Sequence, residues 1–242
     1  MTDTSFLLPP EWAPHSALWI GWPRLADDWP EGLVAAREEA ANLIRTASRF
    51  VPVRVCIGGP RSMQDAQKRG LDEVADLIPV PATDVWLRDT GPIIGLDDGR
   101  LSAQAFLFNG WGGRFGAADD RYTAGAIAAL EGAFVTSHDF ILEGGSIEVD
   151  GEGRLLTTED CLLNPNRNGG WSRQEATRHL KDALGIDEVI WLEKGLLNDH
   201  TDGHVDNIAR FIGPGHVVCQ TASGEDDPHA QRLSEIETTL LS

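Results

Sequence analysis

Hydrophobic and polar positions follow a repeated order along this chain: helix, strand, polar motif, hairpin. Residues 31–50 carry apolar side chains at helical spacing, and the apolar run VPVRVCI at 51–57 predicts a buried strand. A second helical pattern over 62–78 leads to the polar motif WLRDTGP at 86–92. The apolar runs on either side of DDGR, within 93–108, then predict a β-hairpin.

The same order recurs in the middle of the chain. RYTAGAIAALEGA at 121–133 predicts a helix, and a short strand leads from it to the polar motif EGGS at 143–146. IEV and RLLTT then flank DGEG, within 147–158, and predict a second hairpin. The second unit therefore resembles the first in both elements and order.

A third unit follows. Residues 172–185 predict a helix with Ser172 as its N-cap and Gly185 as its stop, and EVIWL at 188–192 predicts a strand. The motif NDHTDGHVDN at 198–207 then precedes a third hairpin, NIARFI and HVVCQT around GPG. We expect equivalent units arranged around a common axis to bring their polar motifs to one centre, although many α/β proteins alternate helices and strands in this way.

The last predicted element is an amphipathic helix over 226–242, with Leu233, Ile236 and Leu240 on one face. Neither a strand nor a hairpin follows it. The pattern therefore predicts an α/β fold of repeated units in which residues 1–242 form a single domain that lacks its C-terminal part.

Composition narrows the class of partner. The 242 residues are 41% hydrophobic, which suffices for a globular core. Thirty-eight acidic and twenty basic residues give a net charge of −18, which argues against nucleic acid and favours cationic small molecules. Residues 1–16 lack the pattern of a secretory signal, and no run approaches the roughly 20 apolar residues of a membrane span. We therefore expect a cytoplasmic protein without a membrane partner, and leave a homo-oligomer open.

Candidate chemistry begins with NDHTDGHVDN, which holds three carboxylates and two imidazoles in ten positions. If the segment is a strand, His204 and Asp206 point to the same face and form an acid–base pair. A hydrogen-bonded surface strand is the alternative for this pair alone. His200, His204 and Asp206 also offer metal-ligand types, but the TDG between the histidines predicts a turn where such spacing needs a helix.

Two further carboxylates stand at equivalent places before the other hairpins. Asp89 lies in WLRDTGP and Glu143 opens EGGS. The structural alternatives are that Asp89 caps its turn while pairing with Arg88, and that Glu143 belongs to an ordinary turn. Together with His204 and Asp206 they predict a guanidinium site, because carboxylates bind that planar cation bidentately and a histidine can move its protons.

These motifs closely resemble the agmatine deiminase family, a bacterial peptidylarginine-deiminase-like branch of the guanidine-modifying enzymes. The matching stretches are PPEWAPHSALWIGWP, WLRDTGP, EGGSIEVDGEGRLLTTEDCLLNPNRN and TDGHVDNIARF, which extend over most of the chain. The resemblance implies a pentein-like propeller of five α/β units, and hydrolysis of a guanidinium such as that of agmatine to a ureido group and ammonia. It implies no metal and no organic cofactor.

Site roles follow from the same resemblance. Asp89 and Asp206 would bind the guanidinium nitrogens, Glu143 would orient the substrate, His204 would be the general acid–base, and Trp86 would lie against the substrate.

Two departures from the family pattern concern the nucleophile and the substrate tail. The family's cysteine lies in a glycine-rich motif resembling GGGNIHC, which is missing here. His200 also stands where we expect an acidic residue that binds the far ammonium of agmatine. Cys56, Cys161 and Cys219 are widely spaced, which disfavours disulfides, and none fits the nucleophile. A guanidinium-binding protein without turnover and a metal-dependent hydrolase therefore stay as alternatives to a deiminase.

Overall fold

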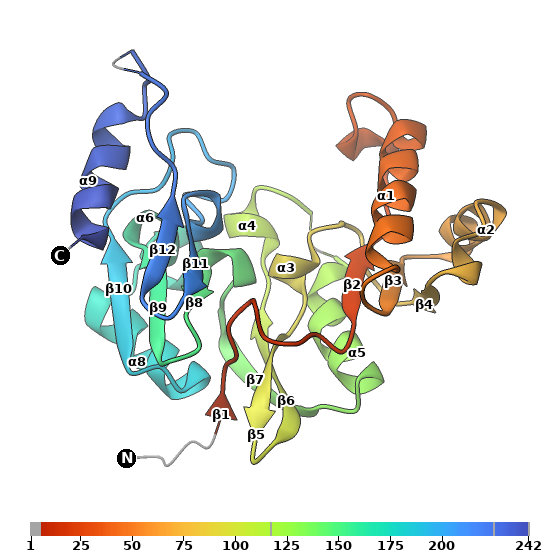
Figure 1. Ribbon diagram of the computed structural model, residues 1–242, viewed down its shortest axis with the longest axis horizontal. Coiled ribbons are helices and arrows are strands. Elements are labelled where there is room, and N and C mark those ends of the chain that lie inside the picture. The colour runs from red at the N-terminus through yellow and green to blue at the C-terminus, as the bar shows by residue number, and fades with distance from the viewer. Residues whose placement is uncertain (1–5, 117, 225, 242) are drawn as a thin grey trace.

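The chain forms a mixed α/β structure whose sheets follow one another in sequence order. The computed structural model describes residues 6–116, 118–224 and 226–241. Figure 1 shows the first sheet at one end of the molecule, the second in the middle and the last two at the other end. The two short helices α3 (Leu87–Thr90) and α4 (Gly110–Gly113) lie between these groups, near the middle of the molecule.

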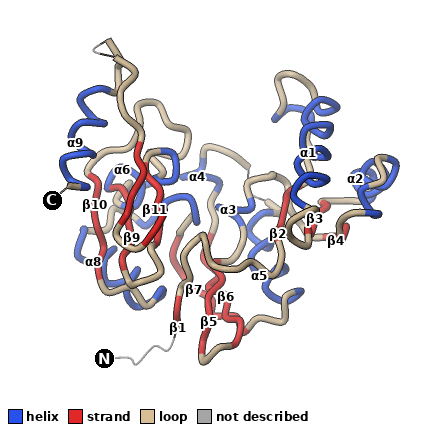
Figure 2. Tube along the Cα trace, in the orientation of Figure 1, coloured by secondary structure: helices blue, strands red, loops and turns tan. Residues whose placement is uncertain are grey.

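The first sheet contains three parallel strands joined by two helices (Figures 1 and 2). Its elements are β2 (Leu18–Gly21), α1 (Leu33–Ala47), β3 (Val53–Ile57), α2 (Pro60–Lys68) and β4 (Asp76–Pro79). The predicted helix α1 and strand β3 are confirmed, but the prediction of one helix over 62–78 is wrong. Gly70 adopts the left-handed conformation with φ of 70° and ends α2, so the following residues are free to form β4.

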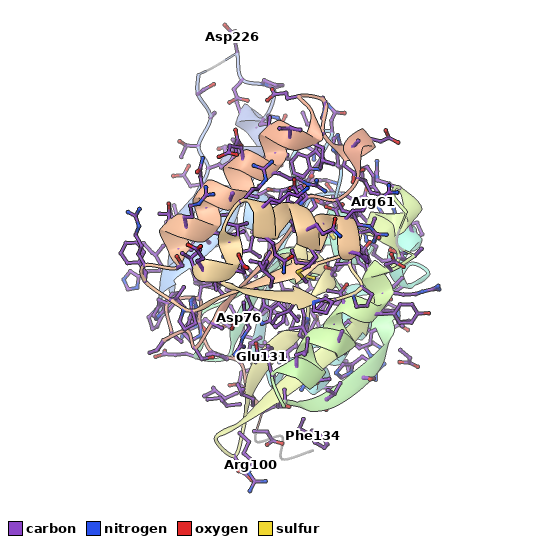
Figure 3. The ribbon with its side chains drawn as sticks, turned by 90° about the vertical axis from the view of Figure 1, so that its right-hand side faces the viewer. Arg61, Asp76, Arg100, Glu131, Phe134 and Asp226 are labelled. Atoms are coloured by element: carbon purple, nitrogen blue, oxygen red, sulfur yellow. The ribbon has the colours of Figure 1, made fainter. Side chains whose placement is uncertain are left out.

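The next two units repeat one topology: an antiparallel hairpin, a helix, and a strand parallel to the second hairpin strand. The second sheet has β5 (Ile93–Asp97), β6 (Arg100–Leu107), α5 (Thr123–Leu130) and β7 (Phe134–Ile141), with β1 (Phe6–Leu7) on its edge. The third has β8 (Ile147–Val149), β9 (Arg154–Thr158), α8 (Arg173–Leu184) and β10 (Glu188–Leu192). Figure 3 shows Arg100 and Phe134 together at the edge where β6 and β7 begin. Both predicted hairpins are confirmed.

The fourth group contains the third predicted hairpin and a helix. Its elements are β11 (Ala209–Gly213), β12 (His216–Cys219) and α9 (Ala230–Leu240). Leu233 and Ile236 are buried on the predicted apolar face of α9. Within the described residues this sheet has two strands, whereas the second and third units each add a parallel strand after their helix.

The remaining elements are short helical turns, most of them in connections between the sheets. They are Ala26–Asp28, Leu71–Glu73, Asp120–Tyr122, Gly144–Ser146 and Val205–Asn207 as 3-10 turns, and α6 (Glu159–Leu162) and α7 (Pro165–Asn168).

Helix α8 of the third sheet has defined caps at both ends and an apolar face packed in the core. The Ser172 hydroxyl accepts from the Glu175 amide while the Glu175 carboxylate accepts from the Ser172 amide, and Gly185 ends the helix at φ of 66°. Both sequence predictions for these ends are confirmed. Leu180 and Leu184 are buried in one core cluster with Leu155 of β9, so the β8–β9 hairpin packs against this helix. No helix among the described residues is both long enough and apolar enough to cross a membrane.

Candidate active site

Three of the predicted side chains converge on Gly145, in the 3-10 turn that follows Glu143. A Cβ atom placed on Gly145 would lie 2.6 Å from Asp206 Oδ2, 2.6 Å from His204 Nδ1 and 2.7 Å from Asp89 Oδ1. With Gly145 itself they come from three connections, since His204 and Asp206 share one, and each connection directly precedes a hairpin. Glycine is required at this position because any side chain would displace the polar groups.

Asp89 is buried and is held by two neutral donors. Its Oδ1 accepts the Gly145 amide at 2.8 Å, and its Oδ2 accepts Trp111 Nε1–H at 2.9 Å. Arg88 does not pair with it, as the structural alternative suggested, but turns to Glu11 and, at 3.5 Å, to Glu148. Asp89 therefore keeps its negative charge oriented without a guanidinium partner from the described part of the chain.

Trp111 was not predicted from the sequence as a site residue. It lies in the glycine-rich segment NGWGGRFG, which fits no phosphate-binding motif. Trp111 has φ of 52°, and its neighbours Gly110 and Gly112 have φ of 72° and 75°, so the backbone turns through the left-handed region to aim the buried indole at Asp89. A tryptophan among glycines is the signal that could have identified it.

Glu143 forms a fully buried ion pair with Arg167 of α7, at 2.9 Å between Nε and Oε1. Burial raises the pKa of Glu143 to about 7, and the Arg167 charge opposes that rise. Arg167 also donates to Asp202 at 2.6 Å and to the Thr201 carbonyl at 2.9 Å. Sequence reasoning missed Arg167, because its partners lie 24 to 35 residues away.

His204 and Asp206 reach the cluster from a 3-10 turn, not from a strand. Residues Val205–Asn207 form the turn, and β11 begins only at Ala209, so the prediction of alternating strand faces is wrong although the two side chains do meet. Burial lowers the pKa of His204, with the Asp89 charge opposing, which favours the neutral imidazole. Burial, together with the Asp89 charge, raises the pKa of Asp206 to about 6.

Asp206 is the one carboxylate of this cluster without any hydrogen-bond or ion-pair partner among the described residues. The other two carboxylates of NDHTDGHVDN have partners. Asp199 accepts from the amides of Thr201, Gly203 and His204, and Asp202 pairs with Arg167 and Arg114. The crowded motif thus contains two structural carboxylates and one unpaired carboxylate.

Trp86 and His200 lie apart from the buried cluster. Trp86 is 60% exposed, one turn before Asp89, and His200 is exposed with its ring 6.3 Å from that of Phe115. His200, His204 and Asp206 do not bring their ligand atoms together. Within the described residues, the group of such atoms within 4.8 Å of one another belongs to Glu143, Cys161 and His204.

Of the three cysteines, Cys161 lies closest to this chemistry. It is fully buried on α6, and burial raises the pKa of its thiol well above the usual value. Burial also raises the pKa of Cys56 in β3 to about 12. Cys219 is half-buried on β12. The expectation that Cys161 is a poor nucleophile agrees with its burial, but its place beside His204 was not predicted.

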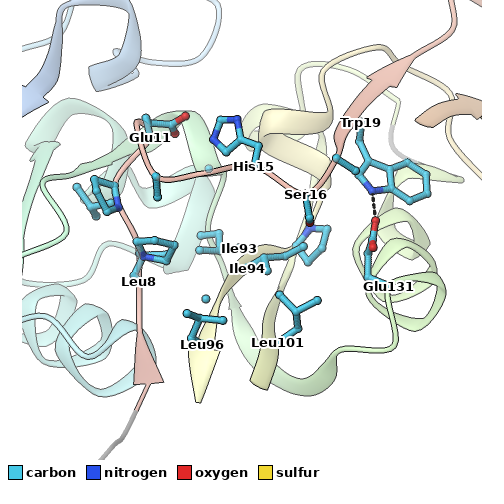
Figure 4. A pocket seen from close by; sticks show the side chains of 18 of the residues that line it. Leu8, Glu11, His15, Ser16, Trp19, Ile93, Ile94, Leu96, Leu101 and Glu131 are labelled. Carbon is cyan, nitrogen blue, oxygen red and sulfur yellow. Dashed lines mark hydrogen bonds between the residues drawn. The ribbon is translucent and has the colours of Figure 1, made fainter. Parts of the chain in front are cut away.

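A separate cavity of about 500 Å³ lies between the N-terminal segment and the β5–β6 hairpin (Figure 4). Its walls are mostly apolar, and Glu11 and His15 lie on one side of it. None of the predicted site residues lines it, although Arg88 and Gly144 do. The cavity therefore lies behind the connections that hold Asp89 and Glu143.

Fold and site together define an α/β protein with an acidic, histidine-containing centre suited to a planar cation. The family described as Porphyromonas-type peptidyl-arginine deiminase matches residues 7–242, and the chain belongs to this family. Agmatine deiminase from Pseudomonas aeruginosa strain UCBPP-PA14 is 40% identical over 234 residues, which cover 94% of this chain and 63% of that protein. The chain thus spans about 63% of the length of this relative.

Solved structures agree with the family. Agmatine deiminase of Enterococcus faecalis superposes with a TM-score of 0.92 at 32% identity, covering 98% of this chain and 66% of that one. A cysteine-to-serine variant of the Campylobacter jejuni agmatine deiminase with bound substrate superposes with a TM-score of 0.91 at 29% identity. The match covers 100% of this chain and 72% of that one. The predicted resemblance to agmatine deiminases and the α/β class are confirmed.

The convergence on Gly145 predicts the effect of adding one methyl group there. Gly145→Ala should displace Asp89, His204 or Asp206 and weaken binding of a guanidinium ligand at least about 10-fold, because a misplaced hydrogen-bonding group loses of order 1.5–3 kcal/mol. Titration calorimetry measures the affinity.

Gly125→Ala is the matched control. Gly125 is exposed in α5, and a Cβ there would meet nothing within 4 Å, so this variant should bind normally and be slightly more stable. Equal affinity of Gly145→Ala and the wild-type chain would contradict the proposed centre.

The raised pKa of Asp206 predicts a pH-dependent stability. Between its ordinary value of 3.8 and about 6, the folded state binds more protons than the unfolded state, so the free energy of unfolding falls as pH rises through this window. Asp206→Asn should remove that cost and stabilise the chain by about 1 kcal/mol at pH 7, after allowance for partial solvent screening, and by almost nothing below pH 4.

Urea denaturation at pH 4 and pH 7 measures this difference, with the exposed Asp72→Asn as control. Destabilisation by Asp206→Asn at pH 7 would mean that the carboxylate has a structural partner.

Proposed function

We propose that this chain supplies most of the active centre of a hydrolase that converts a guanidino substrate, agmatine or a related arginine-type guanidine, to a ureido product and ammonia. The observation that carries this proposal is the meeting of the Asp89 and Asp206 carboxylates and the His204 imidazole at Gly145. Relatives named agmatine deiminase, matched over most of this chain, support it.

Guanidinium binding follows from the unpaired charge. Within the described residues Asp206 forms no hydrogen bond or close ion pair, although the charges of Arg88 and Arg210 act on it from further away. Asp89 is held by two neutral donors. A guanidinium carries five N–H donors in one plane, so two carboxylates can hold it flat and neutralise its charge. Bound cation would also lower the pKa of Asp206, because it stabilises the ionised form.

His204 and Glu143 would transfer protons during the reaction. In a balanced reaction, neutral His204 first takes the proton of the cysteine thiol, and the resulting thiolate adds to the guanidinium carbon. The C–N bond to the departing nitrogen then breaks, and His204 gives that nitrogen the proton. Water then adds to the same carbon and the C–S bond breaks, with His204 accepting the proton of water. Burial keeps His204 neutral and so able to accept a proton, and the Glu143 pKa of about 7 lies in the range where general acid–base catalysis works.

We place the nucleophilic cysteine in the part of the protein outside these 242 residues. Cys161 and Cys56 have raised thiol pKa values, which leave little thiolate, and the unmatched third of the relatives' length offers room for another cysteine. The Campylobacter jejuni structure with bound substrate was obtained with a cysteine replaced by serine, which supports a cysteine-dependent reaction in relatives.

A ring of five units is part of the same proposal. Two described units share one hairpin–helix–strand topology, and a third hairpin with its helix follows. Such repetition places equivalent connections around one centre, and the three connections that meet at Gly145 fit that arrangement.

The protein extended by its remaining C-terminal part should release ammonia from agmatine or arginine. Asp206→Asn should then weaken guanidinium binding by about 10- to 150-fold, because a hydrogen bond to a charged group contributes about 1.5–3 kcal/mol. Ammonia release and titration calorimetry measure the two quantities, and Asp72→Asn should change neither. Binding without turnover would favour a guanidinium-binding protein, and normal affinity in Asp206→Asn would remove Asp206 from the site.

The preference for the substrate's tail is expected to depend on His200. Asp199 is already bound by amides of its own loop, and Asp202 by Arg167 and Arg114, so no carboxylate of this motif other than Asp206 is free for a terminal ammonium. We expect agmatine and butylguanidine to differ by less than about 10-fold in kcat/KM, which corresponds to about 1.4 kcal/mol. His200→Glu should raise the preference for agmatine, whereas His216→Glu on β12 should not. A strong agmatine preference in the wild-type protein would show that another group binds the amine.

A further inference from the structure

Two buried polar atoms beside the candidate centre have no hydrogen-bond partner within the described residues: Glu143 Oε2 and His204 Nε2. Both side chains are almost fully excluded from solvent, with 0% and 1% of the residue exposed. Leaving such buried atoms unsatisfied destabilises the folded state, so their presence calls for a ligand or a partner.

A third group completes the set. The Cys161 sulfur, also fully buried, lies with one carboxylate oxygen of Glu143 and one ring nitrogen of His204 such that all three atoms are within 4.8 Å of one another. Carboxylate, imidazole and thiolate are together the ligands of a borderline-soft divalent cation. They come from three separate segments, so the arrangement is a property of the folded centre.

We propose that Glu143, Cys161 and His204 form a binding site for a divalent transition-metal ion of the Zn²⁺ class. Ligand bonds of about 2.0–2.3 Å would set the ligand atoms of a tetrahedral ion about 3.3–3.6 Å apart, so each pair of ligand atoms needs to approach by no more than about 1.5 Å. The fourth position would be taken by water or by a neighbouring carboxylate.

Local charge favours a cation despite the nearby Arg167. Three carboxylates, those of Glu143, Asp89 and Asp202, act on Cys161 against the single Arg167 guanidinium. Arg167 is itself fixed by Glu143 Oε1, Asp202 and the Thr201 carbonyl, which leaves Glu143 Oε2 available. Binding would displace the thiol proton of Cys161 into solvent, so affinity should increase with pH.

This site differs from the metal set that the sequence offered. His200 and Asp206 do not belong to it, and Glu143 and Cys161 replace them as ligands. If the proposed deiminase function holds, a metal ion here would occupy the general acid–base His204 and the orienting Glu143, and would inhibit turnover. Metal binding itself does not depend on that function and can be measured on residues 1–242.

Co²⁺ is the direct probe, because a cobalt–thiolate bond produces a sulfur-to-metal charge-transfer band in the near ultraviolet. Anaerobic titration of the untagged chain with Co²⁺ should give this band at one equivalent, and Zn²⁺ should abolish it by displacement. Cys161→Ser should lose the band and bind Co²⁺ at least about 10-fold more weakly, since even loss of a supporting group near a metal costs 10- to 100-fold. Cys219→Ser, which removes the half-buried thiol of β12, should keep the band.

A second variant covers the case in which Cys161→Ser does not fold. Glu143→Gln keeps the thiol and the imidazole but replaces the carboxylate, so it should retain a charge-transfer band while binding Co²⁺ at least about 10-fold more weakly. The proposal is overturned by absence of the band in the wild-type chain, by its survival in Cys161→Ser, by its loss in Cys219→Ser, or by unchanged affinity in Glu143→Gln.

Inhibition is tested separately on the complete protein. Zn²⁺ should suppress ammonia release, a chelator should restore it, and Cys161→Ser should be at least about 10-fold less sensitive to Zn²⁺. Cobalt binding in a chain whose complete form releases no ammonia would support the metal site and reject only the deiminase.

Discussion

The buried cation of Arg167 organises the candidate centre. Its guanidinium joins Glu143, which precedes β8, to Asp202 and Thr201, which precede β11. Removing one partner of such a fully buried pair costs about 3–5 kcal/mol, because the other charge is left without solvent or counter-ion. Two connections that are distant in sequence are therefore fixed relative to each other, and His204, two residues after Asp202, is carried into place with them.

The same cluster contains a carboxylate, Asp206, whose ionised form destabilises the folded state. Asp206 is partly buried without a partner among the described residues, and burial beside Asp89 raises its pKa to about 6. A chain selected only for stability would replace it with a neutral side chain, since uncompensated charge disfavours the folded state. By contrast, Asp199 accepts from amides of its own loop, and Asp202 pairs with Arg167 and Arg114 from other segments. The absence of a close partner thus distinguishes Asp206 from the two structural carboxylates in one ten-residue motif.

Much of this fold follows from local pattern. The hairpins around DDGR, DGEG and GPG and the capped helix α8 are fixed by neighbouring residues, so alternation and end signals were sufficient to predict them. The helix predicted over 62–78 failed because the left-handed Gly70 ends it early. His204 and Asp206 do lie close together, but a 3-10 turn brings them there, where a strand was expected.

The missed residues share a different property: their importance depends on contacts across the fold. Arg167 is one basic residue in NPNRN until the structure buries it against Glu143, and Cys161 is a small apolar side chain until the same packing places it beside His204. Trp111 contacts Asp89 only because two glycines allow its backbone to adopt positive φ. Sequence position identified the acids because each precedes a hairpin. The groups that tune those acids lie on other segments, where no local pattern distinguishes them from core residues, and only tertiary packing gives them their chemical role.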